Sequence, residues 1–344
     1  MRERVVLGLS GGVDSAVAAS LLAADYDVYC VWLSIGPCAA GEDDARAVAA
    51  RLGLPFEAAD ISRALEREVC APFARDYLSG RTPLPCARCN PAVKFPALLA
   101  AADRVGARYV ATGHYARTGV GRDGRALLLK GLPANDQSYM LSRLPQDILR
   151  RVRFPLGGYE KAQVRAMAGL GELPVADKPD SMEICFVPGG DYAAWLDARG
   201  GTPPPGDFVD KTGNVLGRHK GIHHYTLGQG RGLGISGPHR YFVSAIRPET
   251  NEVLLSDGGD LCAETVFCTD PNWISIPALE GPMAVDVRLR HSKSQTPAAL
   301  LPAGAGVEIR LNVPARAPTP GQLAVFYQGD VVVGSAWIAE RPGG

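Results

Sequence analysis

The sequence predicts an α/β fold in which a parallel-sheet domain is followed by a small central domain and a C-terminal β-barrel. Over the first 110 residues or so, short apolar runs alternate with Ala-rich helical stretches, a pattern typical of parallel βαβ units with both sheet faces covered. After Leu255, apolar and polar residues alternate with a period of two, as in half-buried antiparallel strands. Since 344 residues exceed one ordinary core, we expect domains at 1–198, 199–256 and 257–344.

The elements of the first region are recognised by their composition. Continuous apolar runs predict buried strands, and Ala-rich or amphipathic runs of about ten residues predict helices. The expected strands are Val5–Leu9, Asp27–Leu33 and Arg108–Thr112, and the expected helices are Ser15–Ala24, Asp43–Leu52 and Phe95–Ala102.

The later regions differ from the first in composition and in hydrophobic pattern. Residues 130–200 are mixed and helical, and the Pro-rich run TPPPGDF at 202–208 opens the central segment. In the last segment, Val285–Leu289 and Val307–Leu311 alternate apolar and polar side chains, and Leu323–Tyr327 and Val331–Val333 bracket a Gln-Gly-Asp turn. This pattern predicts strands and a terminal hairpin.

Charge and composition exclude several classes of protein. The 36 basic and 36 acidic residues cancel, which rules out a uniformly basic nucleic-acid binder but leaves room for a local basic face. No apolar run approaches the roughly 20 residues that span a bilayer, and the apolar run after Arg4 is too short for a signal peptide. We therefore expect a cytoplasmic protein, whose eight cysteines serve as reduced thiols, metal ligands or redox groups and not as a disulfide framework.

A glycine-rich loop lies between the first strand and the first helix and reads Gly8-Leu9-Ser10-Gly11-Gly12-Val13-Asp14-Ser15. Two adjacent glycines permit a sharp turn that brings amide groups to phosphate oxygens, and the following helix directs its free N–H groups to the same point. Asp14 is a candidate magnesium ligand. An ordinary Gly-Gly turn is the alternative, but the complete run SGGVDS favours phosphate binding.

The loop has no Gly-Lys-Ser/Thr, so it differs from loops that grip a γ-phosphate and suits pyrophosphate release with adenylyl transfer. Ligands of open α/β sheets bind beyond the carboxyl ends of the strands. Leu33 is the last residue of one such strand and Gly113 follows another, and both are candidates to contact the nucleotide. These features resemble the PP-loop ATP pyrophosphatase superfamily, several of whose chemistries remain open at this point.

The cysteines suggest sulfur chemistry. Cys86 and Cys89 form a C-x-x-C between prolines, and Cys185 comes a hundred residues later. A thiolate can carry a transferable sulfur as a persulfide, and a second thiol releases that sulfur by forming a disulfide. The lysine five residues past Cys89 would lower the pKa of that thiol. No second C-x-x-C or His pair supports a four-ligand zinc site. Packing is the expected role of Cys30, Cys70, Cys262 and Cys268, and Cys38 is unassigned.

The roles of several histidine, arginine and lysine side chains are less clearly indicated by the sequence. His114 directly follows Gly113, which favours a place beside the nucleotide or a base. His223 and His224 look like metal ligands, but on a strand they would face opposite ways, so we expect structural or RNA-facing roles. A solvated face and a surface that tracks phosphates are equally compatible with one basic cluster: Arg143, Arg150, Arg151, Arg153, Lys161 and Arg165.

Five further motifs extend the resemblance along nearly the whole chain. They are ATGHYAR at 111–117, NDQSYML at 135–141, EICFV at 183–187, HYTLGQGRGLG at 224–234 and TPGQLAVFY at 319–327. Together they resemble the tRNA-specific 2-thiouridylase family. The resemblance implies a PP-loop domain, a small central domain and a C-terminal β-barrel. It also implies ATP-dependent adenylation of the C2 oxygen of the wobble uridine, followed by replacement of that oxygen with sulfur.

Transferred residue by residue, the resemblance places the family's nucleophile on Cys89 and its persulfide carrier on Cys185. It implies ATP contacts at Gly8–Ser15, Leu33 and Gly113. The positions that approach tRNA or its target base would be His114, Asn135, Asp136, Gln137, Arg290, His291 and Gln322. ATP and Mg²⁺ are the implied cofactors. The implied partners are the anticodon stem-loop of tRNA and an external sulfur donor, either a protein or a sulfide pool.

One departure changes the expected chemistry. The family's Asn-Pro-Asp before the first cysteine reads Leu84-Pro85-Cys86 here, so a third cysteine replaces the aspartate. Cys86, Cys89 and Cys185 could hold three irons of a 4Fe-4S cluster and leave one iron open for sulfide, a set one short of the usual four cysteines. A persulfide and a cluster both remain open, as do two more distant hypotheses: a PP-loop ligase that uses ammonia, and a non-catalytic tRNA-binding protein.

Overall fold

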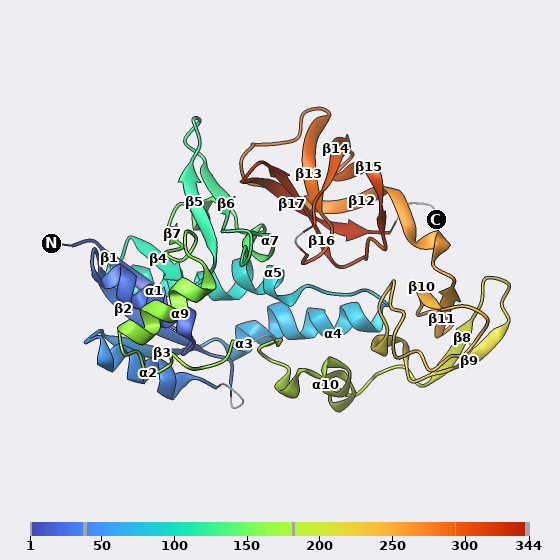
Figure 1. Cartoon of the computed structure of the whole chain (residues 1–344), viewed down its shortest axis with the longest axis horizontal. Helices are drawn as coiled ribbons and strands as arrows, with labels where there is room; N and C mark the ends of the chain where they lie inside the picture. The colour runs from blue at the N-terminus through green and yellow to red at the C-terminus, as the bar shows by residue number, and fades with distance from the viewer. Residues whose placement is uncertain (1, 37–39, 181–182, 293, 341–344) are drawn as a thin grey trace.

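The computed structural model describes residues 2–36, 40–180, 183–292 and 294–340. Its N-terminal half is built on a five-stranded sheet with strand order β3-β2-β1-β4-β7 (Figure 1). All four neighbouring pairs are parallel, which confirms the predicted fold class. The strands are β1 (Arg4–Gly8), β2 (Asp27–Ser34), β3 (Phe56–Asp60), β4 (Tyr109–Thr112) and β7 (Val152–Arg153).

Both faces of this sheet are buried, which explains why Val5, Val6 and Leu7, the central residues of β1, are all apolar. Val5 and Leu7 pack into one apolar layer with helices α1 (Val13–Ala23), α2 (Glu42–Arg51) and α9 (Lys161–Leu170). Val6, between them, faces a second layer that contains α6 (Phe95–Val105). Alternate residues of a strand point to opposite faces, so a strand between two helical layers has no polar side.

The strand order reverses at β1, which has β2 on one side and β4 on the other. Gly8 at the end of β1 is in register with Thr112 at the end of β4. The loop after β1 and the segment after β4 therefore leave the sheet side by side. This is the switch point at which open α/β sheets bind ligands.

Two helical rods contain π-helical turns that the sequence did not predict. One consists of α3 (Ser62–Leu65), η1 (Glu66–Cys70) and α4 (Ala71–Leu78), and the other of α5 (Pro85–Cys89), η2 (Asn90–Lys94) and α6. In both, the η segment is π-helical. Such turns occur frequently at functional sites, and the second one directly follows Cys89.

The remaining elements before residue 200 include a hairpin that leaves the parallel-sheet region. It consists of β5 (Ala116–Val120) and β6 (Ala126–Lys130). The short helices are α7 (Ser138–Leu141), α8 (Gln146–Leu149), η3 (Pro188–Gly190) and α10 (Tyr192–Arg199). Among the described residues, no helix is long and apolar enough to cross a membrane.

The central segment forms a four-stranded sheet with strand order β10-β11-β8-β9. Its strands are β8 (Gly206–Val209), β9 (Val215–His219), β10 (Phe242–Arg247) and β11 (Glu252–Ser256). The 3-10 turn η4 (Ile222–His224) contributes Ile222 to a small core with Phe208, Val243 and Val253. His223 and His224, which we expected on a strand, therefore lie on this turn.

After the 3-10 turn η5 (Gly259–Leu261), the chain forms a closed barrel. Its strands are β12 (Cys262–Trp273), β13 (Met283–Arg288), β14 (Thr296–Ala303), β15 (Gly306–Arg316), β16 (Leu323–Gln328) and β17 (Val331–Ala339). Because β12 pairs with both β15 and β17, these six strands close on themselves. The predicted β16–β17 hairpin is confirmed.

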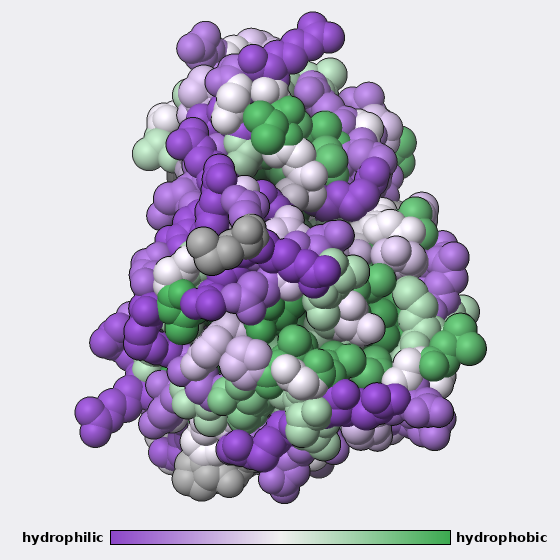
Figure 2. Space-filling view, turned by 90° about the vertical axis from the view of Figure 1, so that its left-hand side faces the viewer, coloured by the Kyte–Doolittle hydropathy of each residue, from purple (hydrophilic) through white to green (hydrophobic). Residues whose placement is uncertain are grey.

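The barrel is joined to the first half of the chain through the β5–β6 hairpin. Val331 of β17 pairs with Leu129 of β6, so the hairpin extends the barrel sheet (Figure 1). Seen from the end at which the parallel sheet lies, the surface is largely hydrophilic, and apolar side chains gather in the lower half of that face (Figure 2).

Candidate active site

The glycine-rich loop has the geometry of an anion cradle. Gly11 has φ +77°, and a Cβ at this position would lie 2.3 Å from the carbonyl oxygen of Gly41, so a larger residue is excluded. The Ser15 hydroxyl accepts from the Ser10 amide at 3.1 Å and donates to the Gly12 carbonyl at 3.0 Å. No side chain caps α1 at Gly12, and its first-turn N–H groups remain for an anionic ligand.

Leu9 and Val13 occupy a different place from the rest of the loop. Both side chains are buried in the core, so only their backbone groups are available to a bound anion. The anion-binding loop therefore offers backbone donors and the Ser10 hydroxyl, while the buried side chains of Leu9 and Val13 fix the loop to the core.

The carboxylate of Asp14 is engaged by other side chains. One of its oxygens lies 2.6 Å from Lys161 Nζ and accepts a hydrogen bond from the Tyr115 hydroxyl at 2.6 Å. Lys161 also pairs with Asp180 at 2.8 Å. A magnesium ion on this carboxylate would lie against an ammonium group, so the geometry does not fit the expected role of Asp14 as a magnesium ligand.

Gly113 permits a close approach, but the group that approaches it is the protein's own backbone and not a nucleotide. A Cβ on Gly113 would lie 2.8 Å from the backbone nitrogen of Ser15. The residue after it, His114, shares a 2.7 Å hydrogen bond with Thr112 and stacks on Phe95 with ring centroids 6.3 Å apart. Gly113 therefore brings the end of β4 against the phosphate loop and places His114 beside it.

The three candidate thiols lie together. Cys89 packs at the edge of an apolar cluster to which Leu33 and Phe186, the neighbour of Cys185, also belong. Burial raises the pKa of the Cys89 thiol to about 11, and Cys185 and Cys86 raise it further through their charges. Burial and Cys86 likewise raise the pKa of Cys185. Every described cysteine is a free thiol.

Lys94 is the cation of this group. Its charge lowers the pKa of Cys89 and of Cys185, and together with burial it holds the pKa of His114 well below the ordinary value. Lys94 has no carboxylate partner among the described residues. Its positive charge is therefore available to the thiols, and His114 is a neutral imidazole at neutral pH.

The arrangement of the thiols limits the metal sites they can form. Within the described ranges, the sulfurs of Cys86, Cys89 and Cys185 are not all within 4.8 Å of one another, which argues against one metal ion held by all three. A polynuclear cluster binds each thiolate through a different iron, so these three thiols still fit a cluster.

Cys70, which we expected to be inert, is buried, and its pKa is raised to about 12 chiefly by burial. Cys38 lies outside the described residues.

Residues of the barrel contact the segment that contains the C-x-x-C motif. Gln322 donates hydrogen bonds to the carbonyl groups of Thr82 and Pro83 at 2.9 and 3.4 Å. Arg88, between the two cysteines, stacks over Trp337 of β17 at 4.9 Å. Gln322 therefore positions the segment that leads to Cys86.

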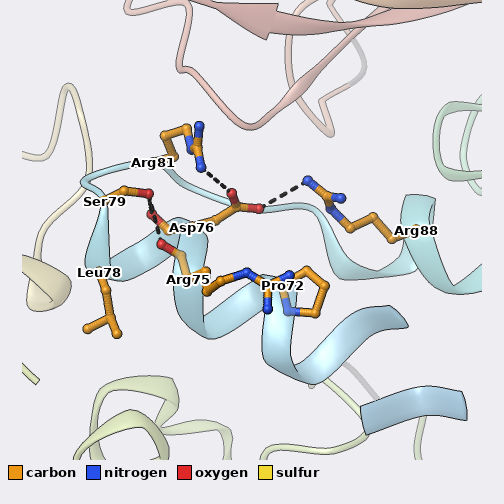
Figure 3. A pocket seen from close by; sticks show the side chains of 7 residues that line it. All are labelled: Pro72, Arg75, Asp76, Leu78, Ser79, Arg81 and Arg88. Carbon is orange, nitrogen blue, oxygen red and sulfur yellow. Dashed lines mark hydrogen bonds and ion pairs between the residues drawn. The ribbon is translucent and has the colours of Figure 1, made fainter. Parts of the chain in front are cut away.

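A positively charged pocket of about 580 Å³ opens beside this segment (Figure 3). The buried Asp76 carboxylate pairs with Arg81 at 3.0 Å and Arg88 at 3.2 Å. Arg75 also lines the pocket and has no ion pair in the described part of the chain. The pocket thus contains three guanidinium groups and one carboxylate, and one of the three arginines, Arg88, directly precedes Cys89.

The residues expected near tRNA fall on two loops that the structure brings together. Asp136 and Arg288 form a buried ion pair at 2.7 Å, although 152 positions separate them. His291 lies close by, with its ring centroid 5.9 Å from that of Tyr139. Asn135 and Gln137 are the neighbours of Asp136, and Arg290 lies two positions after Arg288. The loop around Asp136 and the loop after Arg288 therefore lie on the same side of the molecule.

Within this group, Asp136 differs from its neighbours. Its carboxylate accepts hydrogen bonds from Gly131 and Ser138 in addition to Arg288. With its acceptors satisfied by the protein, Asp136 shapes the loop, whereas Arg290 and His291 are exposed. The basic cluster of the sequence is also divided, because Lys161 and Arg165 bind Asp180 and Arg143 binds Asp270.

Several residues of the site gave no signal in the sequence. Tyr115 and Lys161 reach Asp14 from 101 and 147 positions away, and Trp337 supports Arg88 from the last strand. The first two contacts depend on how the elements of the first domain pack, and the third depends on how the barrel meets that domain. A single sequence offers no periodicity or spacing that reports such contacts.

Comparison with known proteins gives matches along the whole chain. Family models match residues 3–189 (tRNA methyl transferase HUP domain), 195–257 (tRNA methyl transferase PRC-barrel domain) and 263–338 (aminomethyltransferase beta-barrel domain). A tRNA-specific 2-thiouridylase of Paracoccus denitrificans is 44% identical, with 100% of this chain and 93% of the relative covered. That of Heliobacterium modesticaldum is 43% identical (99% and 94% covered), and that of Desulfitobacterium hafniense 40% (98% and 98%).

Proposed function

Because the chain belongs to the tRNA-specific 2-thiouridylase family, we propose that this sulfurtransferase replaces the C2 oxygen of the wobble uridine of tRNA with sulfur. The observation that carries the proposal is the grouping of Cys89, Cys185, Lys94 and His114 beside the phosphate loop. Gly113 links the two parts, since it abuts the start of α1 and directly precedes His114.

The first step is activation of the uridine. ATP lies over Gly8–Ser15 and is supported by Leu33 and the end of β4, and the uracil C2 oxygen attacks its α-phosphate as pyrophosphate leaves. Adenylation is needed because a carbonyl oxygen is a poor leaving group, whereas AMP is a good one. The uncapped N–H groups of α1 stabilise the phosphate charge, and Lys161 holds Asp14 in place.

The second step transfers sulfur. The terminal sulfur of a Cys185 persulfide attacks C2, and the Cys89 thiolate then attacks the inner sulfur. A Cys89–Cys185 disulfide forms, the sulfur–sulfur bond breaks, and its electron pair stays on the sulfur at C2, which expels AMP. An external sulfur donor supplies the persulfide, and an external thiol reductant reopens the disulfide. Lys94 stabilises the Cys89 thiolate, the charged form that attacks.

The tRNA reaches this site across surfaces on both sides of the thiols. The uridine must leave its stack for C2 to be accessible. Asn135, Gln137, Arg290 and His291 lie on two adjoining loops, and we assign them to contacts with the tRNA. The three guanidinium groups of the pocket beside Arg88 suit the phosphates of an anticodon stem-loop.

A sulfur-carrying 4Fe-4S cluster is the second candidate for the transfer step. It is favoured by Cys86, the third thiol that acts on both Cys89 and Cys185. Cys86, Cys89 and Cys185 would hold it, and a bound cluster would supply an iron that carries sulfide. An ammonia-using ligase, by contrast, has no use for the grouped thiols.

The test is mass spectrometry of tRNA nucleosides after incubation of the protein with ATP, tRNA, a thiol reductant and a polysulfide, which supplies sulfur at the oxidation level of a persulfide. We expect 2-thiouridine at the wobble position, formed with one pyrophosphate per thiolation. Cys185→Ser should abolish thiolation while ATP binding persists. Cys262→Ser, which changes an exposed cysteine of the barrel, is the matched control and should retain activity. Thiolation by the Cys185→Ser variant would refute the role assigned to Cys185.

A further inference from the structure

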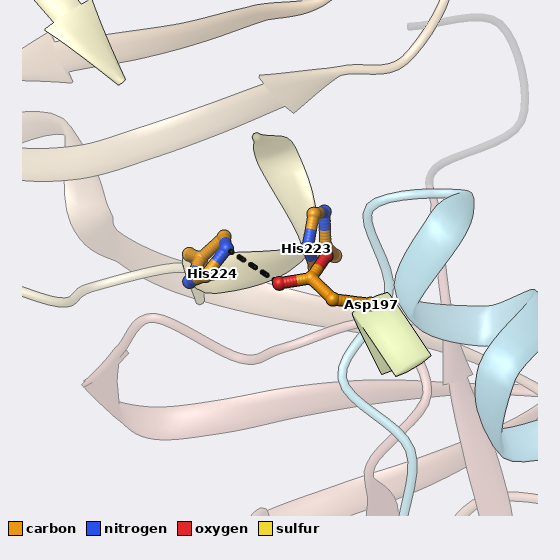
Figure 4. A group of neighbouring side chains, drawn as sticks. All are labelled: Asp197, His223 and His224. Atoms are coloured by element: carbon orange, nitrogen blue, oxygen red, sulfur yellow. Dashed lines mark hydrogen bonds and ion pairs between the residues drawn. The ribbon is translucent and has the colours of Figure 1, made fainter. Parts of the chain in front are cut away.

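Asp197, His223 and His224 bring together metal-ligating atoms that the proposed reaction does not use (Figure 4). Asp197 lies in the last turn of α10, and the two histidines end η4. His223 Nε2 is 3.0 Å from one carboxylate oxygen of Asp197, and His224 Nε2 is 3.8 Å from the other. No other three His, Cys, Asp or Glu side chains of the described ranges place their ligand atoms within 4.8 Å of one another.

Local backbone geometry makes this convergence possible. On a strand, adjacent side chains would point to opposite faces. On the 3-10 turn, the His223 and His224 ring centroids are 4.4 Å apart with an angle of 47° between their planes. Gly221 has φ +131°, and a Cβ there would lie 2.6 Å from the ring of His223. The glycine therefore admits the buried ring and fixes its direction.

One polar atom of this group is unsatisfied. His223 Nδ1 is buried and has no hydrogen-bond partner in the described structure. His223 Nε2 shares a 3.0 Å hydrogen bond with Asp197 Oδ1. Because a carboxylate accepts, Nε2 carries the ring proton in this contact, and a metal ion on Nε2 would take the place of that proton, which then moves to Nδ1.

We propose that Asp197, His223 and His224 bind one divalent transition-metal ion of the zinc class and thereby tie α10 to the central domain. Zinc bonds to imidazole nitrogen and carboxylate oxygen are about 2.0–2.2 Å long. The 3.0 Å separation between His223 and Asp197 fits two neighbouring ligands, and the 3.8 Å separation of His224 requires closure by a few tenths of an ångström. Two imidazoles and one carboxylate favour zinc, cobalt or nickel over magnesium or calcium.

The ion would have a structural role. Three protein ligands leave a fourth position for water, and η4 packs against α4, the helix that ends the first helical rod. A metal ion shared by Asp197 and η4 would tie the central domain to α10, whose Leu196 packs in one cluster with Phe73 and Tyr77 of that rod. The ligands are 26 or 27 positions apart in the sequence, so the ion also closes the Pro-rich segment between them.

The test uses the full chain with Cys86, Cys89 and Cys185 all replaced by serine, so that the thiols cannot bind the metal. After chelator treatment, titration with Zn²⁺ or Co²⁺ should show one bound equivalent and a raised melting temperature. Asp197→Asn and His224→Gln should each weaken binding about tenfold or more, since even outer-shell partners of metal ligands are typically worth 10–100-fold.

His239→Gln is the matched control, because His239 is an exposed histidine outside the group, and it should bind metal as the parent does. Failure of the parent to bind an equivalent would overturn the proposal, as would unchanged binding by both His224→Gln and Asp197→Asn. Because the readout is metal binding in a chain without the three thiols, its outcome is independent of whether the protein thiolates tRNA.

Discussion

Lys94 ends the π-helical turn that begins directly after Cys89, and its ammonium group lowers the pKa of the Cys89 thiol. A π-helical turn pairs residue i with residue i+5, so it places Lys94 over Cys89 on the same side of the helix. A regular α-helix pairs i with i+4 and would turn the lysine away. The π-helical turn thus gives Cys89, the proposed nucleophile, its cation.

Replacing Lys94 should make Cys89 less reactive. Burial raises the pKa of Cys89, and Lys94 opposes that effect, so Lys94→Met should raise the pKa further and reduce the thiolate fraction at any given pH. The pH profile of Cys89 alkylation by iodoacetamide, followed by peptide mass spectrometry, should move to higher pH. Lys94→Arg should restore the profile, and Lys220→Met, a change of an exposed lysine, should leave it unaltered. A profile unchanged in Lys94→Met would remove the electrostatic role.

Replacing Cys86 should separate the two modes of sulfur transfer. If a persulfide carries the sulfur, Cys86→Ser retains thiolation and the protein needs no iron. If a cluster carries it, Cys86→Ser loses both iron and thiolation, because one of three ligands is gone. Iron analysis of anaerobically purified protein measures bound iron, and nucleoside mass spectrometry measures the thiolation that this protein catalyses. We expect the persulfide outcome, and bound iron that is lost with Cys86 together with activity would contradict it.

The buried ion pair between Asp136 and Arg288 should be important for stability. The side chains are 3% and 10% exposed, so Arg288→Met would strand a buried carboxylate at a cost of about 3–5 kcal/mol. Urea unfolding followed by fluorescence would measure the loss. Arg46→Gln breaks the exposed pair with Glu42 and should cost no more than about 0.5 kcal/mol. Equal losses in the two variants would show that the buried pair is not special.

His114 should make stability depend on pH below the ordinary histidine range. Burial, aided by Lys94, holds its folded pKa well below 6.5, while the unfolded chain binds a proton near pH 6.5. Stability is therefore fully present above that value and falls as the pH drops below it. His114→Asn should reduce the slope of unfolding midpoint against pH between pH 7 and 5. His239→Asn, at an exposed histidine, should keep the parent slope.

Much of the fold is predictable from this sequence, because each signal is local. The apolar strands and Ala-rich helices of the parallel sheet follow from periodicity, and SGGVDS between Leu9 and Ala16 marks the turn from β1 to α1. The β16–β17 hairpin follows from a turn between alternating runs. The motifs around Cys89 and Cys185 also indicated the sulfur chemistry of the family.

Tertiary structure alone decided which side chains meet. The ion pairs of Lys161 with Asp14 and of Arg288 with Asp136 join positions more than 140 residues apart, and no spacing rule links such positions. It also changed one interpretation, since a 3-10 turn in place of a strand lets His223 and His224 converge on Asp197. Local propensity acts over a few residues, whereas burial and charge pairing act through space, so the sequence by itself determined the elements and only the packed chain determined their partners.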